Sequence, residues 1–275
     1  MGGLELGPSG DPDLEPSDPA PAPSRPLHGR TALVTGGTSG IGLEVVRRFV
    51  RAGADVVALA RRPSDEVDRA GGRSLVCDVA DPGQVAESFR DAAELLGPLD
   101  VLVLNAGISR LDGGGLDRMD AASFRSMLEV NTMGVFHGLQ QAPARMRDGG
   151  SVIITATAAL WWPFPDYMSY SGSKAALHAM CTHAAMKLGR RGIRVNTVSP
   201  GTILTGMQPD DDAEARINPL ATCLGRVGRP EDVGGVYVFL ASDDSRYVTG
   251  TDIRVDGGWI GGLTYAEADK LLAEP

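Results

Sequence analysis

The feature of this chain that most constrains its fold is a regular alternation of short β-rich runs with longer stretches of helical periodicity. The first run, TALVT, begins at Thr31 and leads into glycines, and the next stretch places apolar residues at helical spacing until Gly53. Strands that alternate with helices form a parallel sheet covered on both faces. Because the crossovers are right-handed, the sequence predicts a Rossmann-like, doubly wound parallel sheet in a single α/β domain, with ligands beyond the carboxyl ends of the strands.

The individual elements follow from the same periodicities. Strands are expected at residues 31–37, 55–60, 73–78, 99–107, 151–157, 193–201 and 251–258. Helices are expected at residues 41–53, 82–96, 120–146, 169–189 and 230–242.

Composition indicates one domain with two tails. The chain has 275 residues, 43% of them hydrophobic, which is enough for one sizeable core. Residues 1–26 are rich in Pro, Asp and Gly, so we expect a disordered tail, with ordering on assembly as the alternative. The predicted catalytic domain covers residues 27–262, and residues 263–275 form a C-terminal tail.

Charge and hydropathy argue against two classes of partner. The net charge of −9 is opposite to the basic surface that nucleic-acid binding needs. No apolar run reaches the length of a membrane span, and the N-terminus lacks the basic start and apolar stretch of a signal peptide. Cys77, Cys181 and Cys223 are odd in number and lack metal-ligand spacing, so we expect reduced thiols in a cytoplasmic protein without a bound metal.

A glycine-rich turn joins the first predicted strand to the first predicted helix. From Thr35 to Gly42 it reads TGGTSGIG, a T-G-x-x-x-G-x-G pattern. Glycines let the backbone approach a pyrophosphate, and the helix N-terminus offers N–H groups and a partial positive charge. A structural turn could have the same composition, but the strand–turn–helix context favours phosphate binding. The residues expected to bind this ligand are Gly36, Thr38, Ser39, Gly40, Ile41 and Gly42.

Further motifs follow in order along the chain. They are Asn105-Ala106-Gly107, Asn131, the Y-x-x-x-K pair Tyr170 and Lys174, Pro200-Gly201 with Thr205 after it, and Asp256-Gly257-Gly258. Together with the glycine turn they resemble the short-chain dehydrogenase/reductase family over roughly residues 28–260. The resemblance implies a nicotinamide cofactor, held also by Asn105, Ala106, Gly107, Tyr170, Lys174, Pro200, Gly201, Ile203 and Thr205.

The end of the second predicted strand indicates which nicotinamide cofactor is used. Folds that select NAD usually place a carboxylate there, which repels a 2′-phosphate. In this chain the acidic position is Ala60, and Arg61 and Arg62 follow it. A guanidinium matches a phosphate in charge and geometry, so we expect NADPH/NADP⁺, although both arginines could be solvated loop charges.

The third strand is expected to end beside the adenine. The resemblance implies that Asp78 accepts from the adenine amine and that Val79 packs on the ring. The alternative for Asp78 is that it caps the helix beginning near Pro82.

Tyr170 and Lys174 are the expected catalytic pair. They lie four residues apart, so they share one face of a helix. A nearby ammonium stabilises a phenolate and lowers the pKa of a tyrosine, which suits it to acid–base chemistry. The resemblance gives Lys174 a second role in holding the nicotinamide ribose. Tyr167 has Ser171 rather than a lysine four residues later, so we expect it to have a pocket or packing role.

The chain departs from the family at the catalytic serine. That serine lies thirteen residues before the tyrosine, where this chain has Thr157. A threonine hydroxyl can bond a substrate carbonyl, but its methyl group restricts χ1 and occupies pocket space. We expect Thr157 to substitute, with packing and slow or lost activity as the alternative. Asn131 is expected to support a water that relays protons through Lys174, with a helix kink or a satisfied buried amide as the alternative.

Two segments are expected to shape the substrate side. Residues 206–225 lie where the family places a mobile lid, and the acidic run at 210–212 is expected to be solvated surface. Trp161, Trp162, Pro163 and Phe164 lie where the family builds a pocket wall, so they favour a bulky apolar or aromatic substrate, with core or interface packing equally open.

The predicted function is an NADPH-dependent ketoreductase or the reverse alcohol dehydrogenase. Hydride reaches a carbonyl carbon while Thr157 and Tyr170 polarise the oxygen and Tyr170 delivers the proton. An epimerase or dehydratase with transient oxidation, or a non-catalytic NADP-binding scaffold, are the alternatives. The resemblance also implies a homodimer or homotetramer, because the family commonly pairs the helix that carries Tyr170 across a two-fold axis.

Overall fold

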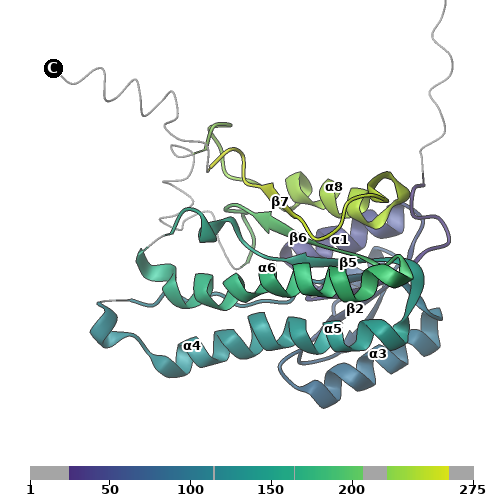
Figure 1. Cartoon of the computed structure of the whole chain (residues 1–275), viewed down its shortest axis with the longest axis horizontal. Helices are drawn as coiled ribbons and strands as arrows, with labels where there is room; N and C mark the ends of the chain where they lie inside the picture. Colours follow the sequence, from purple (N-terminus) through teal and green to yellow (C-terminus); the bar gives the residue numbers. More distant parts are fainter. Residues whose placement is uncertain (1–24, 114, 164, 207–221, 260–275) are drawn as a thin grey trace, which may run out of the picture.

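A seven-stranded parallel sheet forms the centre of the molecule in a computed structural model that describes residues 25–113, 115–163, 165–206 and 222–259 (Figure 1). The strand order is β3-β2-β1-β4-β5-β6-β7, and every neighbouring pair is parallel. The strands are β1 (Thr31–Thr35), β2 (Asp55–Ala60), β3 (Arg73–Val76), β4 (Leu99–Leu104), β5 (Met146–Thr155), β6 (Arg194–Pro200) and β7 (Asp252–Val255). This is the predicted doubly wound sheet.

Helices cover both faces of the sheet (Figure 1). They are α1 (Gly40–Arg51), α2 (Asp65–Arg69), α3 (Pro82–Leu96), α4 (Ala121–Met127), α5 (Gly134–Arg145), α6 (Met168–Leu188) and α8 (Pro230–Ala241). Helices α1 and α8 pack together on one face, and α3, α5 and α6 lie on the other. No helix in the described ranges has both the length and the apolarity to cross a membrane.

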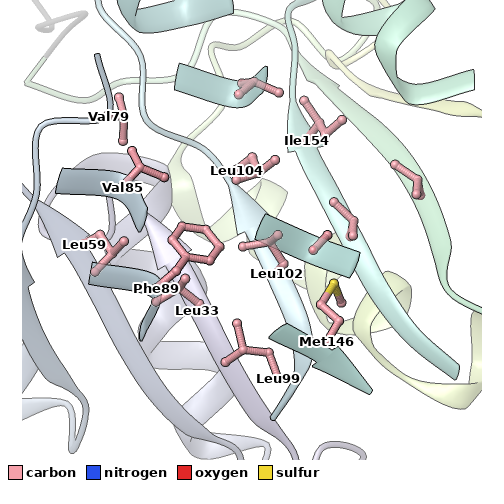
Figure 2. Packing of buried hydrophobic residues seen from close by; sticks show 14 of the residues in the cluster. Leu33, Leu59, Val79, Val85, Phe89, Leu99, Leu102, Leu104, Met146 and Ile154 are labelled. Carbon is pink, nitrogen blue, oxygen red and sulfur yellow. The ribbon is translucent and has the colours of Figure 1, made fainter. Parts of the chain in front are cut away.

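The strands supply apolar side chains to both faces, which explains their near-continuous hydrophobic runs. In β1, Ala32 and Val34 belong to the core under α1 and α8, whereas Leu33 between them belongs to the core under α3, α5 and α6. Figure 2 shows the latter core, in which Phe89 packs beside Leu33 and Leu59. Burial on both sides of the sheet holds the carboxyl ends of the strands in place, and those ends carry most of the predicted site.

The order of the strands reverses between β1 and β4. From β1 the chain proceeds outward through β2 to β3, then returns to pair β4 on the other side of β1. The crossovers diverge at this point, which leaves the edge above β1 and β4 uncovered, and ligands bind at such switch points. The glycine turn after β1 and the Asn105-Ala106-Gly107 segment after β4 lie there.

Three local features differ from the sequence prediction. Helix α2 was not predicted, because it is only five residues long. The predicted long helix is helical from Ala121 to Arg145, but its middle, Leu128–Met133, is π-helical. Strand β5 begins at Met146 rather than at residue 151, because Met146 pairs with Leu99 before a register shift.

The two predicted tails fall largely outside the described residues. Of the N-terminal tail only residues 25 and 26 are described, and the whole C-terminal tail lies outside the described residues.

Candidate active site

A cleft of about 640 Å³ lies along the carboxyl ends of the strands. All but one of the residues predicted from the sequence to be catalytic or to bind the cofactor line it, although they come from seven separate parts of the chain. The predicted residues on its walls are Gly36, Thr38, Ser39, Gly40, Ile41, Gly42, Arg61, Arg62, Asp78, Val79, Asn105, Ala106, Gly107, Thr157, Tyr170, Lys174, Pro200, Gly201, Ile203 and Thr205. The exception is Asn131, which is fully buried behind the wall.

The glycine turn is held close to the loop after β4. Gly36 has φ +65. A Cβ there would lie 2.8 Å from the Cα of Ala106, and only a movement of the backbone would relieve this clash. The Asn105 side-chain amide donates to the carbonyl oxygens of Thr35 and Gly36, at 3.2 and 3.3 Å. The glycine at position 36 therefore lets the turn pack closely on the loop after β4 as it leads into the N-terminus of α1, where helix N–H groups suit a pyrophosphate.

Threonine hydroxyls join the strands beneath this floor. Thr35 Oγ1 accepts from the backbone N–H groups of Asn105 and Ala106. Thr155 Oγ1 at the end of β5 donates to Asn105 Oδ1 at 3.1 Å and bonds the buried Tyr237 hydroxyl at 2.7 Å. The loops that form the floor are thus hydrogen-bonded to the sheet, which holds them in position.

Two arginines lie at one end of the cleft. Arg61 and Arg62 follow β2 and are exposed, and neither forms an ion pair with another residue in the described ranges. Other arginines nearby are paired, such as Arg47 with Glu66. Cationic side chains without a protein anion can accept an anionic ligand without first breaking an ion pair.

Asp78 and Val79 lie next to the arginines along the cleft. Asp78 Oδ1 accepts from the backbone N–H of Ala80, whereas Asp81 caps α3 by accepting from Gly83 and Gln84. The alternative role of Asp78 as the cap of this helix is therefore wrong. Val79 is buried against Gly134 of α5, with its side chain on the cleft wall.

Helix α6 brings Tyr170 and Lys174 to the cleft on one face, as the spacing predicts. Lys174 is almost wholly buried, with 3% of its surface exposed, and its Nζ donates to the Thr155 carbonyl oxygen at 2.8 Å. Burial lowers the pKa of Lys174 to about 8, because desolvation disfavours the ammonium. The ring of Tyr170 meets that of Tyr167 edge to face, with centroids 6.0 Å apart.

Asn131 lies in the π-helical segment and supports the loop after β4. Its Oδ1 accepts from the Ile108 N–H at 2.8 Å, and its Nδ2 donates to the Ile108 carbonyl oxygen and to Ser173 Oγ. A Cβ at Gly107 would lie 3.2 Å from both Asn131 Oδ1 and Lys174 Nζ. Asn131 is therefore a satisfied buried amide within reach of Lys174, with one acceptor position on Oδ1 beyond these bonds.

Thr157 takes the position of the family's serine at the end of β5. It is buried, and its Oγ1 accepts from the backbone N–H of Ala159 at 3.2 Å, which caps the short 3₁₀ turn Ala158–Leu160. This bond uses an acceptor position and fixes the rotamer of a side chain that is already stiff at χ1. The hydroxyl proton is not used by this bond and can be donated into the cleft.

The far end of the cleft is formed by the segment after β6. Pro200, Gly201, Ile203 and Thr205 line it, and Thr205 Cγ2 would lie 3.2 Å from a Cβ at Gly40. Trp259 also lines this end and is 3% exposed. Trp259 was not predicted from the sequence, although it lies directly after the Asp256-Gly257-Gly258 motif.

The predicted aromatic wall is wrong for both tryptophans. Trp161 packs outside the cleft, edge to face with His178 at 5.2 Å and under the Arg254 guanidinium at 5.3 Å. Trp162 is half-exposed and does not line the cleft. Phe164 and the acidic run 210–212 of the expected lid lie outside the described residues.

Tyr167 lies on the cleft wall instead. Together with Ala159 it also borders a second, smaller cavity of about 290 Å³. The other residues around that cavity are Leu160, Pro163, Met168, Ser171, Gly172 and Ala175.

Comparisons with known proteins agree with this geometry. Residues 36–260 match the family model described as enoyl-(acyl carrier protein) reductase. The L-rhamnose 1-dehydrogenase (NAD(P)(+)) of Sphingomonas sp. (strain SKA58) is 38% identical, over 84% of this chain and 96% of that protein. The 2,5-dichloro-2,5-cyclohexadiene-1,4-diol dehydrogenase of Sphingobium indicum is 34% identical, over 86% and 98%. A short-chain dehydrogenase from Burkholderia cenocepacia J2315, solved in complex with NADP, has a TM-score of 0.79 and 34% identity, and the match covers 85% of this chain and 99% of that one.

Proposed function

The chain belongs to the short-chain dehydrogenase/reductase family, and from this premise we propose that it is an NADPH-dependent oxidoreductase that reduces a ketone to an alcohol, or catalyses the reverse. Members of the family use nicotinamide cofactors, and this chain is an oxidoreductase of that family. The observation that carries the finer proposal is the meeting of Tyr170, Lys174 and Thr157 in the same cleft as the glycine turn and Arg61.

The cleft fits a dinucleotide. In this assignment the Gly36–Gly42 turn would hold the pyrophosphate, Asp78 and Val79 would hold the adenine, and Ile203 and Thr205 would hold the nicotinamide. The support for the fit is that the glycine turn, Asp78, Val79, Ile203 and Thr205 all line one cleft, with the turn leading into the N-terminus of α1. When bound, NADPH supplies the hydride that reduces the carbonyl carbon.

Residues of this chain handle the proton. Tyr170 donates its phenolic proton to the substrate oxygen, and the Thr157 hydroxyl donates a hydrogen bond to the same oxygen. The Lys174 ammonium stabilises the phenolate that remains, at a strength that burial increases. Asn131 offers its last acceptor position to a water that returns a proton through Lys174.

The preference for NADPH over NADH rests on Arg61 and Arg62. Ala60 leaves the end of β2 without a carboxylate, and the guanidinium groups of Arg61 and Arg62, which form no ion pair with any residue that the structure describes, lie on the cleft wall beside it. A 2′-phosphate would find complementary charge there, whereas a bare ribose hydroxyl would gain little. The NADP bound to the Burkholderia cenocepacia relative is consistent with this preference.

The substrate in this proposal is a bulky apolar or aromatic small molecule. The support comes from Tyr167 and Ala159 rather than from the tryptophans, because these two residues border both the cleft and the second cavity. That cavity is lined mostly by apolar groups, so it suits a hydrocarbon extension of a substrate whose carbonyl is at Tyr170.

The test is a panel of ketones that differ in size and polarity, assayed by the oxidation of NADPH at 340 nm. We expect turnover with aryl and polycyclic ketones and little with short polar ones. A protein that binds NADPH but reduces no member of the panel would contradict ketone reduction and favour an epimerase or dehydratase, which product analysis would identify.

A further inference from the structure

Helix α6, which carries Tyr170, begins without a capping side chain of its own. Its N-cap residue is Tyr167, which makes no side-chain cap bond. By contrast, α2, α3 and α4 each begin after a residue that accepts from their first turn, namely Ser64, Asp81 and Asp120. The first N–H groups of a helix have no partner within the helix, so α6 needs an acceptor from elsewhere.

Asp112 provides that acceptor from 57 residues away in the chain. Its Oδ2 accepts from the backbone N–H of Ser169, the second residue of α6, at 3.0 Å. Its own backbone N–H donates to the Asp166 carbonyl oxygen at 2.9 Å. A carboxylate here also complements the positive end of the helix dipole. Asp112 therefore joins the loop after β4 to the start of α6 through two hydrogen bonds.

The loop that Asp112 ends is itself part of the cleft. Asn105 and Ala106 bond the Thr35 hydroxyl, and Ile108 is held at both its N–H and its carbonyl by Asn131. Ile108 and Ser109 line the cleft, and Asp112 follows three residues after Ser109. The loop is thus fixed to the cofactor floor at one end and to α6 at the other.

We propose that Asp112 is a positioning residue, which holds the first turn of α6 against the loop after β4 and so sets the place of Tyr170 relative to the cleft floor. Tyr170 is the residue directly after Ser169, so a first turn that frays carries the phenol with it. Displacement of a reacting group by about 1 Å greatly slows the reaction. Cofactor binding by the remote floor of the cleft does not depend on that displacement. This role rests on the proposed function for its effect on turnover, but the bond to Ser169 can be tested without turnover.

The experiment compares Asp112→Ala and Asp112→Asn with Asp120→Ala. Asp120 is the matched control, because it accepts from Ala122 and Ser123 at the start of α4 and does not line the cleft. Amide hydrogen exchange is followed over residues 166–172, NADPH affinity by fluorescence, and kcat with a ketone that the wild-type protein reduces.

We expect Asp112→Ala to exchange faster at the start of α6 and to lose roughly five- to tenfold in kcat, with NADPH affinity unchanged. Asp112→Asn should restore most of both, because asparagine caps a helix about as well as aspartate. Asp120→Ala should leave kcat unchanged, although it should lower the Tm about as much as Asp112→Ala does.

Two results would overturn the proposal. One is Asp112→Ala with wild-type exchange over residues 166–172, and the other is a fall in kcat that Asp112→Asn does not reverse or that Asp120→Ala matches. If the wild-type protein reduces no ketone, the proposed function fails, and the exchange comparison still decides whether Asp112 holds the helix.

Discussion

Lys174 shows at the scale of one residue how burial gives an ordinary side chain its chemistry. Its Nζ donates to the Thr155 carbonyl oxygen on the side of the helix where Asn131 and Gly107 lie, and burial lowers its pKa to about 8. The sequence predicted the pair of Tyr170 and Lys174 from their spacing. It did not predict how deeply the ammonium is buried, because that depends on Gly107 in the loop after β4 and on Thr155 at the end of β5.

The lowered pKa of Lys174 predicts the pH dependence of the reaction. As the pH rises through about 8, Lys174 loses its proton, so the positive charge that supports Tyr170 and the proton relay is lost. The rate of ketone reduction should therefore fall on the alkaline side with an apparent pKa near 8. A kcat profile for reduction that stays flat to pH 10 would contradict this role.

Arg61 is the residue on which cofactor choice depends. Arg61→Ala should weaken NADPH binding about ten- to a hundredfold, the worth of one charge-assisted hydrogen bond, and should leave NADH binding unchanged. Arg73→Ala is the control. Arg73 is also an exposed arginine, but it is the first residue of β3, whereas Arg61 follows the last residue of β2. Fluorescence titration with both cofactors measures the effect. Equal loss for NADPH and NADH, or tighter binding of NADH by the wild-type protein, would show that Arg61 does not select the cofactor.

At the scale of elements, local periodicity predicted nearly all of the sheet and its helices. The predictions failed where one element depends on another. The π-helical turn at Leu128–Met133 accompanies the bonds that Asn131 makes to Ile108 and Ser173, and strand β5 begins early because Met146 pairs with Leu99. Neither contact can be recognised from the local sequence pattern. The start of α6 was predicted to within one residue, but its bond to Asp112 was not predicted, because the two residues are far apart in the sequence.

The glycine turn gives a prediction for an element rather than for a charge. Gly36→Ala should raise the Kd for NADPH by about tenfold or more, because its Cβ would press on the Ala106 backbone and move the turn. Gly29→Ala is the control, since Gly29 has a similar φ of +72 but has nothing within 4 Å of an added Cβ. Both variants should lose about 1 kcal/mol of stability from backbone strain. Calorimetry and NADPH titration separate the two effects, and equal NADPH affinities would contradict the close-approach argument.

At the scale of the whole molecule, the site is an assembly of loops that only the sheet brings together. Most residues predicted from motifs line one cleft because their motifs follow strands and parallel strands end at one edge, and α6 brings Tyr170 and Lys174 to the same edge. Residues without a motif were missed, such as Trp259 and Asp112, and Trp161 was placed on the wrong side of its loop. The path of a loop is set by tertiary contacts, so the substrate side of the cleft was less predictable than the cofactor side.

The claim that Tyr170 donates the proton in an NADPH-dependent reduction is tested most directly by Tyr170→Phe. Phenylalanine keeps the ring and its edge contact with Tyr167 but removes the proton. Turnover of the best ketone and the Kd for NADPH should be measured on the same preparation. We predict a loss of kcat of about a hundredfold or more, with NADPH affinity within about twofold of the wild-type value. Wild-type turnover in Tyr170→Phe would contradict the assignment of Tyr170 and the mechanism that depends on it.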